Sequence, residues 1–104
     1  MRSADFRKVY DNGVRVSGPY FAAFCLAPAP QQGPKIGFTV SRAAGNSVLR
    51  NRLRRRLREA VRLSLSRLGP RWLIVFNPRR KALDAPFEDL LAEVRKLFLR
   101  CESL

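Results

Sequence analysis

The sequence predicts a single α+β domain over residues 1–104, with helices and strands in the order αββαβα and with or without one further short strand. The chain has 104 residues and is 46% hydrophobic, which is enough for one modest core. Three short apolar segments have the length of strands, and three other segments repeat their apolar residues every three to four positions, as helices do. No internal repeat or linker divides the chain.

The first expected element is a short helix over residues 4–12. Ser3 is a suitable cap for its first turn, and Gly13 is a suitable residue to end it. Its apolar residues lie three to four positions apart and therefore share one face: Phe6, Val9 and Tyr10.

A strand is expected over residues 20–27, and its two faces are both apolar. One face carries Tyr20, Ala22, Phe24 and Leu26, and the other carries Phe21, Ala23, Cys25 and Ala27. We therefore expect both faces to be covered, by the protein itself or by a partner. A loop rich in proline follows at 28–34, and a second strand is expected at 35–41.

A central strand and a helix close the chain. The continuous apolar run at 72–76 is typical of a strand in the middle of a sheet. A basic loop follows at 77–83, and Asp84 is expected to cap a helix over 85–100. The core stripe of that helix is Phe87, Leu90, Leu91, Val94, Leu97 and Phe98.

The charge of the chain indicates a polyanionic partner. Lysine and arginine number 21 and acids 8, which gives a net charge of +13. Solubility requires far less charge than this in a domain of this size. Nucleic acid is the first candidate and an anionic membrane the second.

Several function classes are disfavoured. Protein nucleases commonly use a histidine base or a carboxylate-bound metal, but the chain has no histidine and its acids are scattered. They are Asp5, Asp11, Glu59, Asp84, Glu88, Asp89, Glu93 and Glu102. We therefore expect no catalytic residue and no metal site in this protein.

The cysteines and the apolar runs bear on the cellular compartment. Cys25 and Cys101 lack the spacing of metal ligands, and we interpret them as idle thiols in a reducing compartment rather than as a disulfide. No apolar run has the length of a membrane span, and the first ten residues do not resemble a signal peptide. A cytoplasmic location is expected.

The most informative segment is an arginine-rich helix expected from about Ser47 to Leu68 and ended by Gly69-Pro70. Seven of the 13 residues from Arg50 to Arg62 are arginine, against one acid, Glu59. At the helical period an apolar stripe faces the sheet: Leu49, Leu53, Leu57, Ala60 and Val61. The opposite face carries Asn51, Arg54, Arg55, Arg58 and Arg62, and the borders carry Arg50, Arg52 and Arg56.

Like charges on one helix face favour a partner that neutralises them. Arg50, Arg54, Arg58 and Arg62 follow one another at i,i+4, and each such pair costs roughly 0.2–0.5 kcal/mol. A face that is merely solvated remains the alternative. Arginine in place of lysine suits bidentate phosphate contacts, and the Gly45-Asn46-Ser47 turn adds backbone amides at a helix N-terminus.

Residues 35–62 resemble the signature of the bacterial ribonuclease P protein component. That family has a strand, then Ser-Lys-Lys-x-Gly-Asn, then an Arg-Asn-Arg motif on a basic helix. The corresponding residues here are Ser41-Arg42-Ala43-Ala44-Gly45-Asn46 and Arg50-Asn51-Arg52. The similarity extends over nearly the whole chain, including the segment DFRKVY at 5–10 and the helix that contains Phe87 and Phe98.

The resemblance implies a cytoplasmic subunit of a ribonucleoprotein endoribonuclease that removes the 5′ leader of precursor tRNA. In that family the RNA subunit holds the catalytic site and uses Mg²⁺, and the protein assists RNA folding, metal affinity and leader recognition. The implied partners are ribonuclease P RNA and precursor tRNA, with no membrane, no obligate protein partner and no protein-bound cofactor. The implied fold is an α/β sandwich with a left-handed βαβ crossover, against the general right-handed preference.

The resemblance also implies two sets of site residues. Eight are expected to face the catalytic RNA: Arg42, Asn46, Arg50, Asn51, Arg52, Arg54, Arg55 and Arg58. Phe6 and Tyr10 are expected to line a cleft for the single-stranded leader, with Phe21 beside it. Stacking suits a leader of varied sequence, at roughly 1–3 kcal/mol per base. Plain core packing is the alternative for these three aromatic residues.

The chain departs from the family pattern at three places. Ala43 replaces the second basic residue before Gly-Asn, which removes one expected phosphate contact. Arg56 is an additional arginine that either contacts RNA or extends along the surface. Asn77 replaces a basic residue after the last strand, and Arg79, Arg80 and Lys81 either compensate for it or form a solvated loop.

Two other functions remain open on the sequence. A structural RNA-binding module, such as a ribosomal protein, would share the charge but would not need an aromatic cleft. A membrane-surface protein would need the apolar stripe of the arginine-rich helix to be free.

Overall fold

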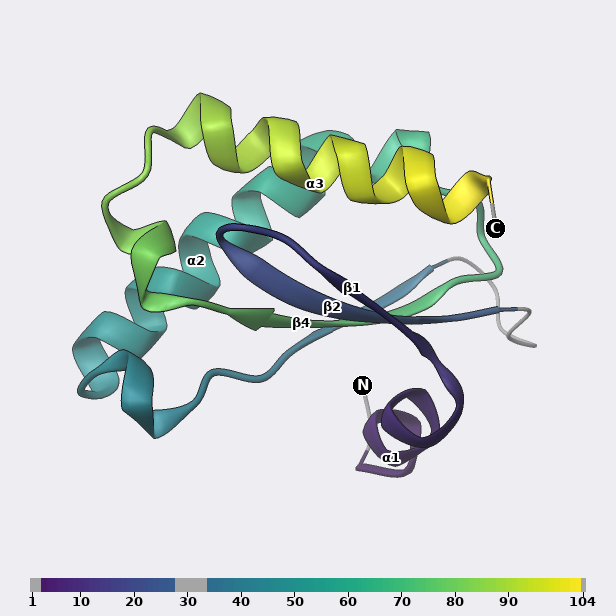
Figure 1. The fold of residues 1–104 in the computed structure, drawn as a ribbon, viewed down its shortest axis with the longest axis horizontal. Coiled ribbons are helices and arrows are strands. Elements are labelled where there is room, and N and C mark those ends of the chain that lie inside the picture. Colours follow the sequence, from purple (N-terminus) through teal and green to yellow (C-terminus); the bar gives the residue numbers. More distant parts are fainter. Residues whose placement is uncertain (1–2, 28–33, 104) are drawn as a thin grey trace.

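The computed structural model describes residues 3–27 and 34–103 and arranges them as a sheet with helices on both faces (Figure 1). The α-helices are α1 (Ser3–Asn12), α2 (Ser47–Ser64) and α3 (Phe87–Glu102). The strands are β1 (Val14–Ser17), β2 (Phe21–Leu26), β3 (Lys35–Phe38) and β4 (Leu73–Pro78). Short 3-10 helices are η1 (Arg42–Ala44), η2 (Leu65–Arg67) and η3 (Arg80–Leu83). The α+β prediction is confirmed.

The sheet has the strand order β1-β2-β4-β3. β1 pairs with β2 and β2 with β4 in antiparallel fashion, and β3 and β4 are parallel neighbours. In the register Val75 of β4 lies between Phe24 of β2 and Gly37 of β3. The apolar run of β4 is therefore central, as its sequence predicts.

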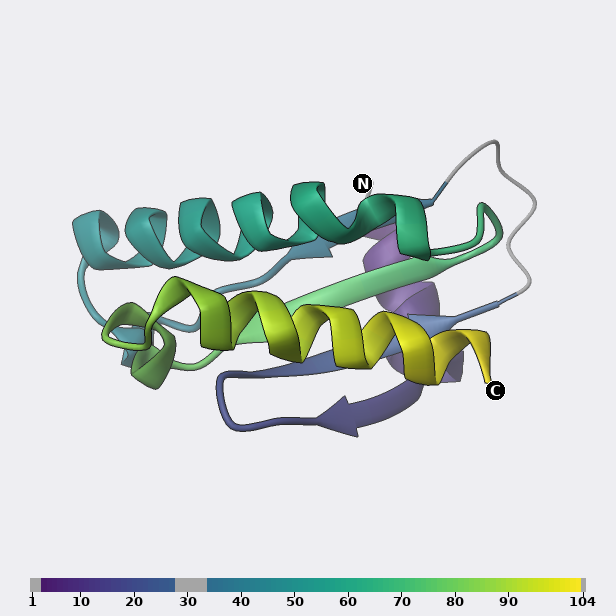
Figure 2. The same cartoon turned by 90° about the horizontal axis from the view of Figure 1, so that it is seen from above.

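The crossover from β3 through α2 to β4 is left-handed (Figure 2). In that view α2 lies in front of the sheet, both strands run from right to left, and β4 lies below β3. A right-handed connection would place β4 above β3. The crossover therefore has the unusual hand that the family resemblance implies, and it sets α2 over the β3 edge of the sheet.

The sheet separates two apolar clusters. The larger cluster lies under α2 and α3 and includes Phe76, Leu53 and Phe98, which are all fully buried. The smaller cluster lies under α1 and is built on Val9 and Val75, which are also fully buried. Side chains of β2 alternate between the two clusters, so the expectation that both of its faces are covered is confirmed.

The boundaries differ from the prediction in several places. β1 is the further short strand that the prediction left open, β3 ends three residues early, and β4 extends through Pro78. The long helix ends at Ser64 and continues as η2. Asp84 does not cap α3: its amide donates to the carbonyl of Lys81 and closes η3, while Pro86 is the N-cap. The loop expected at 28–34 lies outside the described residues except for Pro34.

Candidate RNA-binding surfaces

The turn before α2 is built by three residues with distinct roles. Ser41 caps η1 by accepting from the amide of Ala43 at 3.1 Å. Gly45 has φ +137° and ψ −169°, a conformation open essentially to glycine alone. Asn46 then caps α2, because its Oδ1 accepts from the amide of Leu49 at 3.0 Å. The amide of Leu49, at the N-terminus of α2, is therefore already hydrogen-bonded and is not free to bind an anion. The Asn46 side chain is exposed.

The arginine-rich helix packs its apolar stripe into the protein. Leu53, Leu57, Ala60 and Val61 are buried beneath α2. The stripe is therefore not free to enter a membrane, and the membrane-surface function loses its main support. No helix within 3–27 and 34–103 is long and apolar enough to cross a membrane.

The residues predicted to contact the catalytic RNA are not equally accessible. Six of the eight are exposed: Arg42, Asn46, Asn51, Arg52, Arg55 and Arg58. Arg50 and Arg54 are half-buried, although the helical period placed Arg54 on the outward face. The eight side chains nevertheless all belong to the η1–α2 segment, as predicted.

Several arginines of α2 already have partners within the protein. Arg54 donates through Nη1 to Oδ1 of Asn51, so the oxygen of that amide is occupied while its NH₂ group remains a donor. Arg58 has its guanidinium carbon 5.8 Å from the centroid of the Phe38 ring. Arg56 donates to the carbonyl of Ala85 and ties α2 to the segment before α3. Arg56 thus has an intramolecular role that distinguishes it from the exposed arginines.

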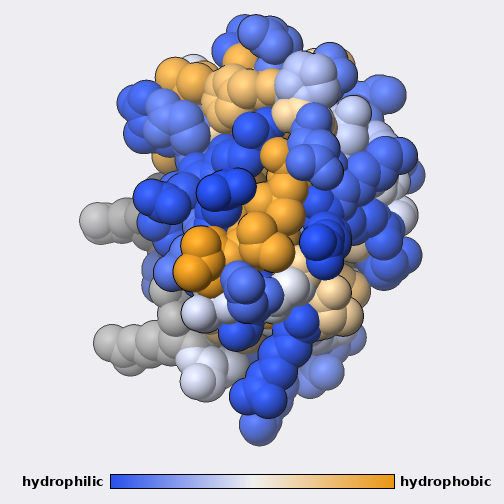
Figure 3. Space-filling model, turned by 90° about the vertical axis from the view of Figure 1, so that its left-hand side faces the viewer, coloured by the Kyte–Doolittle hydropathy of each residue, from blue (hydrophilic) through white to orange (hydrophobic). Residues whose placement is uncertain are grey.

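Acidic partners for the arginines are scarce. Among the described residues, 3–27 and 34–103, there are two ion pairs: Arg62 with Glu59, and Lys96 with Glu93. Hydrogen bonds from Arg62, one of them 3.0 Å long, lower the pKa of the exposed Glu59 carboxyl. Figure 3 views the end of the molecule at which α2 begins, and hydrophilic side chains border an apolar strip there. Among the described residues, the arginines of α2 other than Arg62 therefore have no acidic partner.

A second surface lies on the opposite face of the sheet, beneath α1. Tyr10 is 37% exposed, and its ring meets the half-buried Phe24 edge-on, with 4.8 Å between centroids. The Tyr10 hydroxyl donates to Oδ1 of Asn77 at 3.0 Å. Phe6 is half-buried and packs against the same cluster. Phe6 and Tyr10 therefore share an aromatic surface with Phe24, and Asn77 stands beside them.

Phe21 does not belong to this surface, which corrects its assignment to the cleft. Its side chain is 3% exposed and lies in the cluster under α2 and α3, edge-on to Phe76 at 5.1 Å. Successive residues of a strand point to opposite faces, so Phe21 and Phe24 cannot share one. The strand aromatic on the α1 face is Phe24, which the sequence prediction missed.

The basic loop after β4 is tied to neighbouring strands. Arg79 donates to Oγ of Ser17 at 2.8 Å and to the carbonyl of Gly18 at 3.2 Å. Lys81 lies 5.9 Å from the centroid of the Tyr20 ring. Arg79 and Lys81 thus hold the β1–β2 turn, and Arg80 is exposed. Contact of Arg79, Arg80 and Lys81 with RNA stays a prediction, and a solvated loop stays its alternative.

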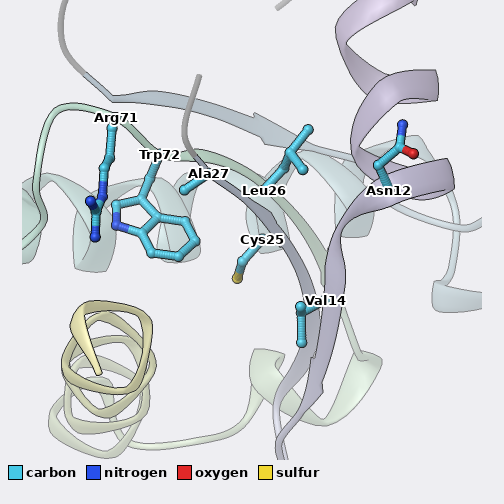
Figure 4. A pocket seen from close by; sticks show the side chains of 7 residues that line it. All are labelled: Asn12, Val14, Cys25, Leu26, Ala27, Arg71 and Trp72. Atoms are coloured by element: carbon cyan, nitrogen blue, oxygen red, sulfur yellow. The ribbon is translucent and has the colours of Figure 1, made fainter. Parts of the chain in front are cut away.

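A cavity of about 310 Å³ lies at the other end of the sheet, where β4 begins (Figure 4). Its walls include Asn12, Trp72 and Cys25.

Cys25 and Cys101 are both free and buried. The hydrogen bond with Cys101, together with burial, raises the pKa of Cys25 well above that of a free thiol. No group of three His, Cys, Asp or Glu side chains in the described ranges is arranged to hold a metal.

Comparisons with known proteins identify the family of this chain. Residues 1–102 match the family model described as Ribonuclease P. The ribonuclease P protein component of Chloroflexus aurantiacus is 41% identical over 97 residues, covering 92% of this chain and 71% of that protein. The Symbiobacterium thermophilum component is 39% identical over 99 residues, covering 95% and 86%.

Solved structures show the same fold. The ribonuclease P protein of Thermotoga maritima has a TM-score of 0.85 at 24% identity, with 96% of this chain and 94% of that chain covered. The Staphylococcus aureus protein has a TM-score of 0.79 at 24% identity, covering 98% and 92%. Given the family match over nearly the full length and relatives about 40% identical, this chain belongs to the ribonuclease P protein family.

Proposed function

We propose that this protein is the subunit of ribonuclease P that docks on the catalytic RNA through α2 and holds the 5′ leader of precursor tRNA against the α1 face of the sheet. The ribonucleoprotein removes the leader by hydrolysis and leaves the mature 5′ end of the tRNA. The RNA carries the catalytic site and its Mg²⁺, and the protein contributes binding energy and orientation. The observation that carries the proposal is the exposed arginine surface of α2, which follows the Gly45-Asn46 turn in a chain that matches the family over residues 1–102.

The physical role of the arginine surface is to replace counterions on the RNA. Contacts to about 6–10 phosphates would make affinity fall about 10³–10⁵-fold between 50 and 200 mM salt. The exposed side chains on α2 that suit this role are Arg52, Arg55 and Arg58. A guanidinium can bind a phosphate through two parallel hydrogen bonds, which a lysine ammonium does not do. A salt response that is nearly flat would contradict this role.

Reconstitution tests the proposal directly. The purified protein alone should not cleave precursor tRNA, and with a bacterial ribonuclease P RNA it should lower the Mg²⁺ concentration needed for cleavage. Arg55→Glu with Arg58→Glu should prevent assembly with that RNA. Lys96→Glu reverses a single charge on α3 and should assemble normally, because a surface ion pair such as that with Glu93 contributes little. Cleavage by the protein without RNA would contradict the proposal.

The leader site has its own test. Tyr10→Ala removes the most exposed ring of the aromatic surface and should weaken precursor tRNA binding by the holoenzyme about 5- to 150-fold, which corresponds to about 1–3 kcal/mol for one stacked base. Binding of mature tRNA should not change, because it has no leader. Phe21→Leu is the matched control, since Phe21 lies on the other face of the sheet. Equal losses for both tRNAs in the Tyr10 variant would show that the ring has a structural role only.

A further inference from the structure

One arginine of α2 is held by an aromatic ring. Arg58 is exposed on α2, and its guanidinium carbon lies 5.8 Å from the centroid of the Phe38 ring. Phe38 is the last residue of β3, the edge strand over which α2 passes. This distance is within the range of about 6 Å at which a cation is attracted to a ring face.

The position of the Phe38 ring is determined by the core. Phe38 stacks on Phe76 with 5.7 Å between centroids and 18° between planes. Phe76 is fully buried and meets Phe21 edge-on at 5.1 Å and Phe98 at 6.5 Å. A row of rings therefore extends from the middle of the core to the surface below Arg58. Because buried rings pack at crystal-like density, the outermost ring has little freedom to move.

The contact orders the arginine without using its hydrogen-bond donors. Attraction to the ring face acts on the charge, so the N–H groups of Arg58 stay available for a phosphate. The other held arginines on this side of α2 differ in this respect: Arg54 donates to Asn51, and Arg62 donates to Glu59. Ordering a long side chain before binding also lowers the entropy that binding removes.

We propose that Phe38 is a positioning residue that holds Arg58 ready for a phosphate of the catalytic RNA. The inference rests on the proposed function, since it requires α2 to face that RNA. It predicts that Phe38, which lies in the sheet, contributes to RNA affinity only through Arg58.

A double-mutant cycle tests this prediction with an in vitro transcribed bacterial ribonuclease P RNA as the probe. Phe38→Leu should weaken binding about 2- to 5-fold in the wild-type background, the effect of a cation–π contact at an exposed site. In the Arg58→Gln background the same substitution should change nothing. Phe38→Tyr keeps the ring and should bind like the wild type. Ile36→Val is the matched control, because Ile36 lies on the same face of β3.

Two results would overturn the proposal. If Phe38→Leu weakens binding equally with and without Arg58, the residue acts through the general packing of β3. If Arg58→Gln binds as tightly as the wild type, Arg58 contacts no phosphate and there is nothing for Phe38 to position. The second result leaves the proposed function to be decided by the double variant Arg55→Glu with Arg58→Glu, which should still prevent assembly through Arg55, so the two failures are distinguishable. Circular dichroism and urea unfolding serve as the controls for the folding of each variant.

Discussion

Gly45→Ala is expected to destabilise the protein by about 2 kcal/mol, within a range of about 1–3 kcal/mol for a residue forced into a glycine-only conformation. The backbone of Gly45 has φ +137° and ψ −169°, and a Cβ there would lie 2.8 Å from Cδ1 and 3.1 Å from Cβ of Leu49. Leu49 is half-buried, so part of the steric conflict can be relieved by a rotamer change. The backbone strain cannot be relieved in this way, and it supplies most of the expected loss.

Urea unfolding followed by the fluorescence of Trp72, which is the one tryptophan and is 4% exposed, measures this loss. In a thermal scan the expected shift is about 8–16 °C, because 1 kcal/mol corresponds to about 4–8 °C in a domain of this size. Gly18→Ala is the control: a Cβ there meets only the carbonyl oxygen of Phe21, at 3.5 Å. That variant should stay within about 0.5 kcal/mol of the wild type. If Gly45→Ala is as stable as Gly18→Ala, the strain argument is wrong.

Three further predictions follow from the same geometry. Asn46→Asp should keep the cap of α2 and the stability of the protein while weakening RNA binding through the added negative charge, whereas Asn46→Ala should cost about 1 kcal/mol in urea unfolding. Cys25 and Cys101 should react with a thiol reagent only as fast as the protein unfolds, since both are buried and the pKa of Cys25 is raised; rapid labelling of the folded protein would contradict this. The lowered pKa of Glu59 means that its pair with Arg62 stabilises the fold above the ordinary carboxyl pKa near 4.5 and is lost as pH falls through the folded value; an NMR titration of Glu59 with a midpoint at or above 4.5 would contradict the pairing.

Local rules explain why the helix–turn region could be predicted from the sequence. The positions of Gly45 and Asn46 depend on backbone conformation and capping, which act over a few residues and are therefore visible in the sequence. The division of α2 into an apolar stripe and a basic face follows from its period alone. The half-burial of Arg54 does not follow from the period, which places this residue on the outward face, and neither does its hydrogen bond to Oδ1 of Asn51.

The face of an aromatic residue in β2 could not be predicted in the same way. When both faces of a strand are apolar, the alternation shows that Phe21 and Phe24 differ but not which of them meets α1. Which of the two rings faces α1 depends on tertiary packing. Val9 and Tyr10 of α1 pack on Val75 and Phe24, and β1 lies between α1 and β2 in the sequence. β1 itself was weakly signalled, because Val14–Ser17 is four residues long and mostly exposed.

The parallel pairing of β3 and β4 places the two proposed RNA sites toward one end of the sheet. Parallel strands have their carboxyl ends at the same end of a sheet, so Asn77, near the end of β4, and the turn at 41–46, after the end of β3, lie toward that same end. The amide of Thr39 donates to the carbonyl of Phe76 at 2.9 Å and extends the pairing toward the turn. Tyr10 reaches Asn77 from the α1 face, while α2 leaves this end on the other face. The Tyr10 hydroxyl and the start of α2 therefore lie toward the same end of the sheet but on opposite faces, so the two proposed RNA sites are separated by the sheet itself.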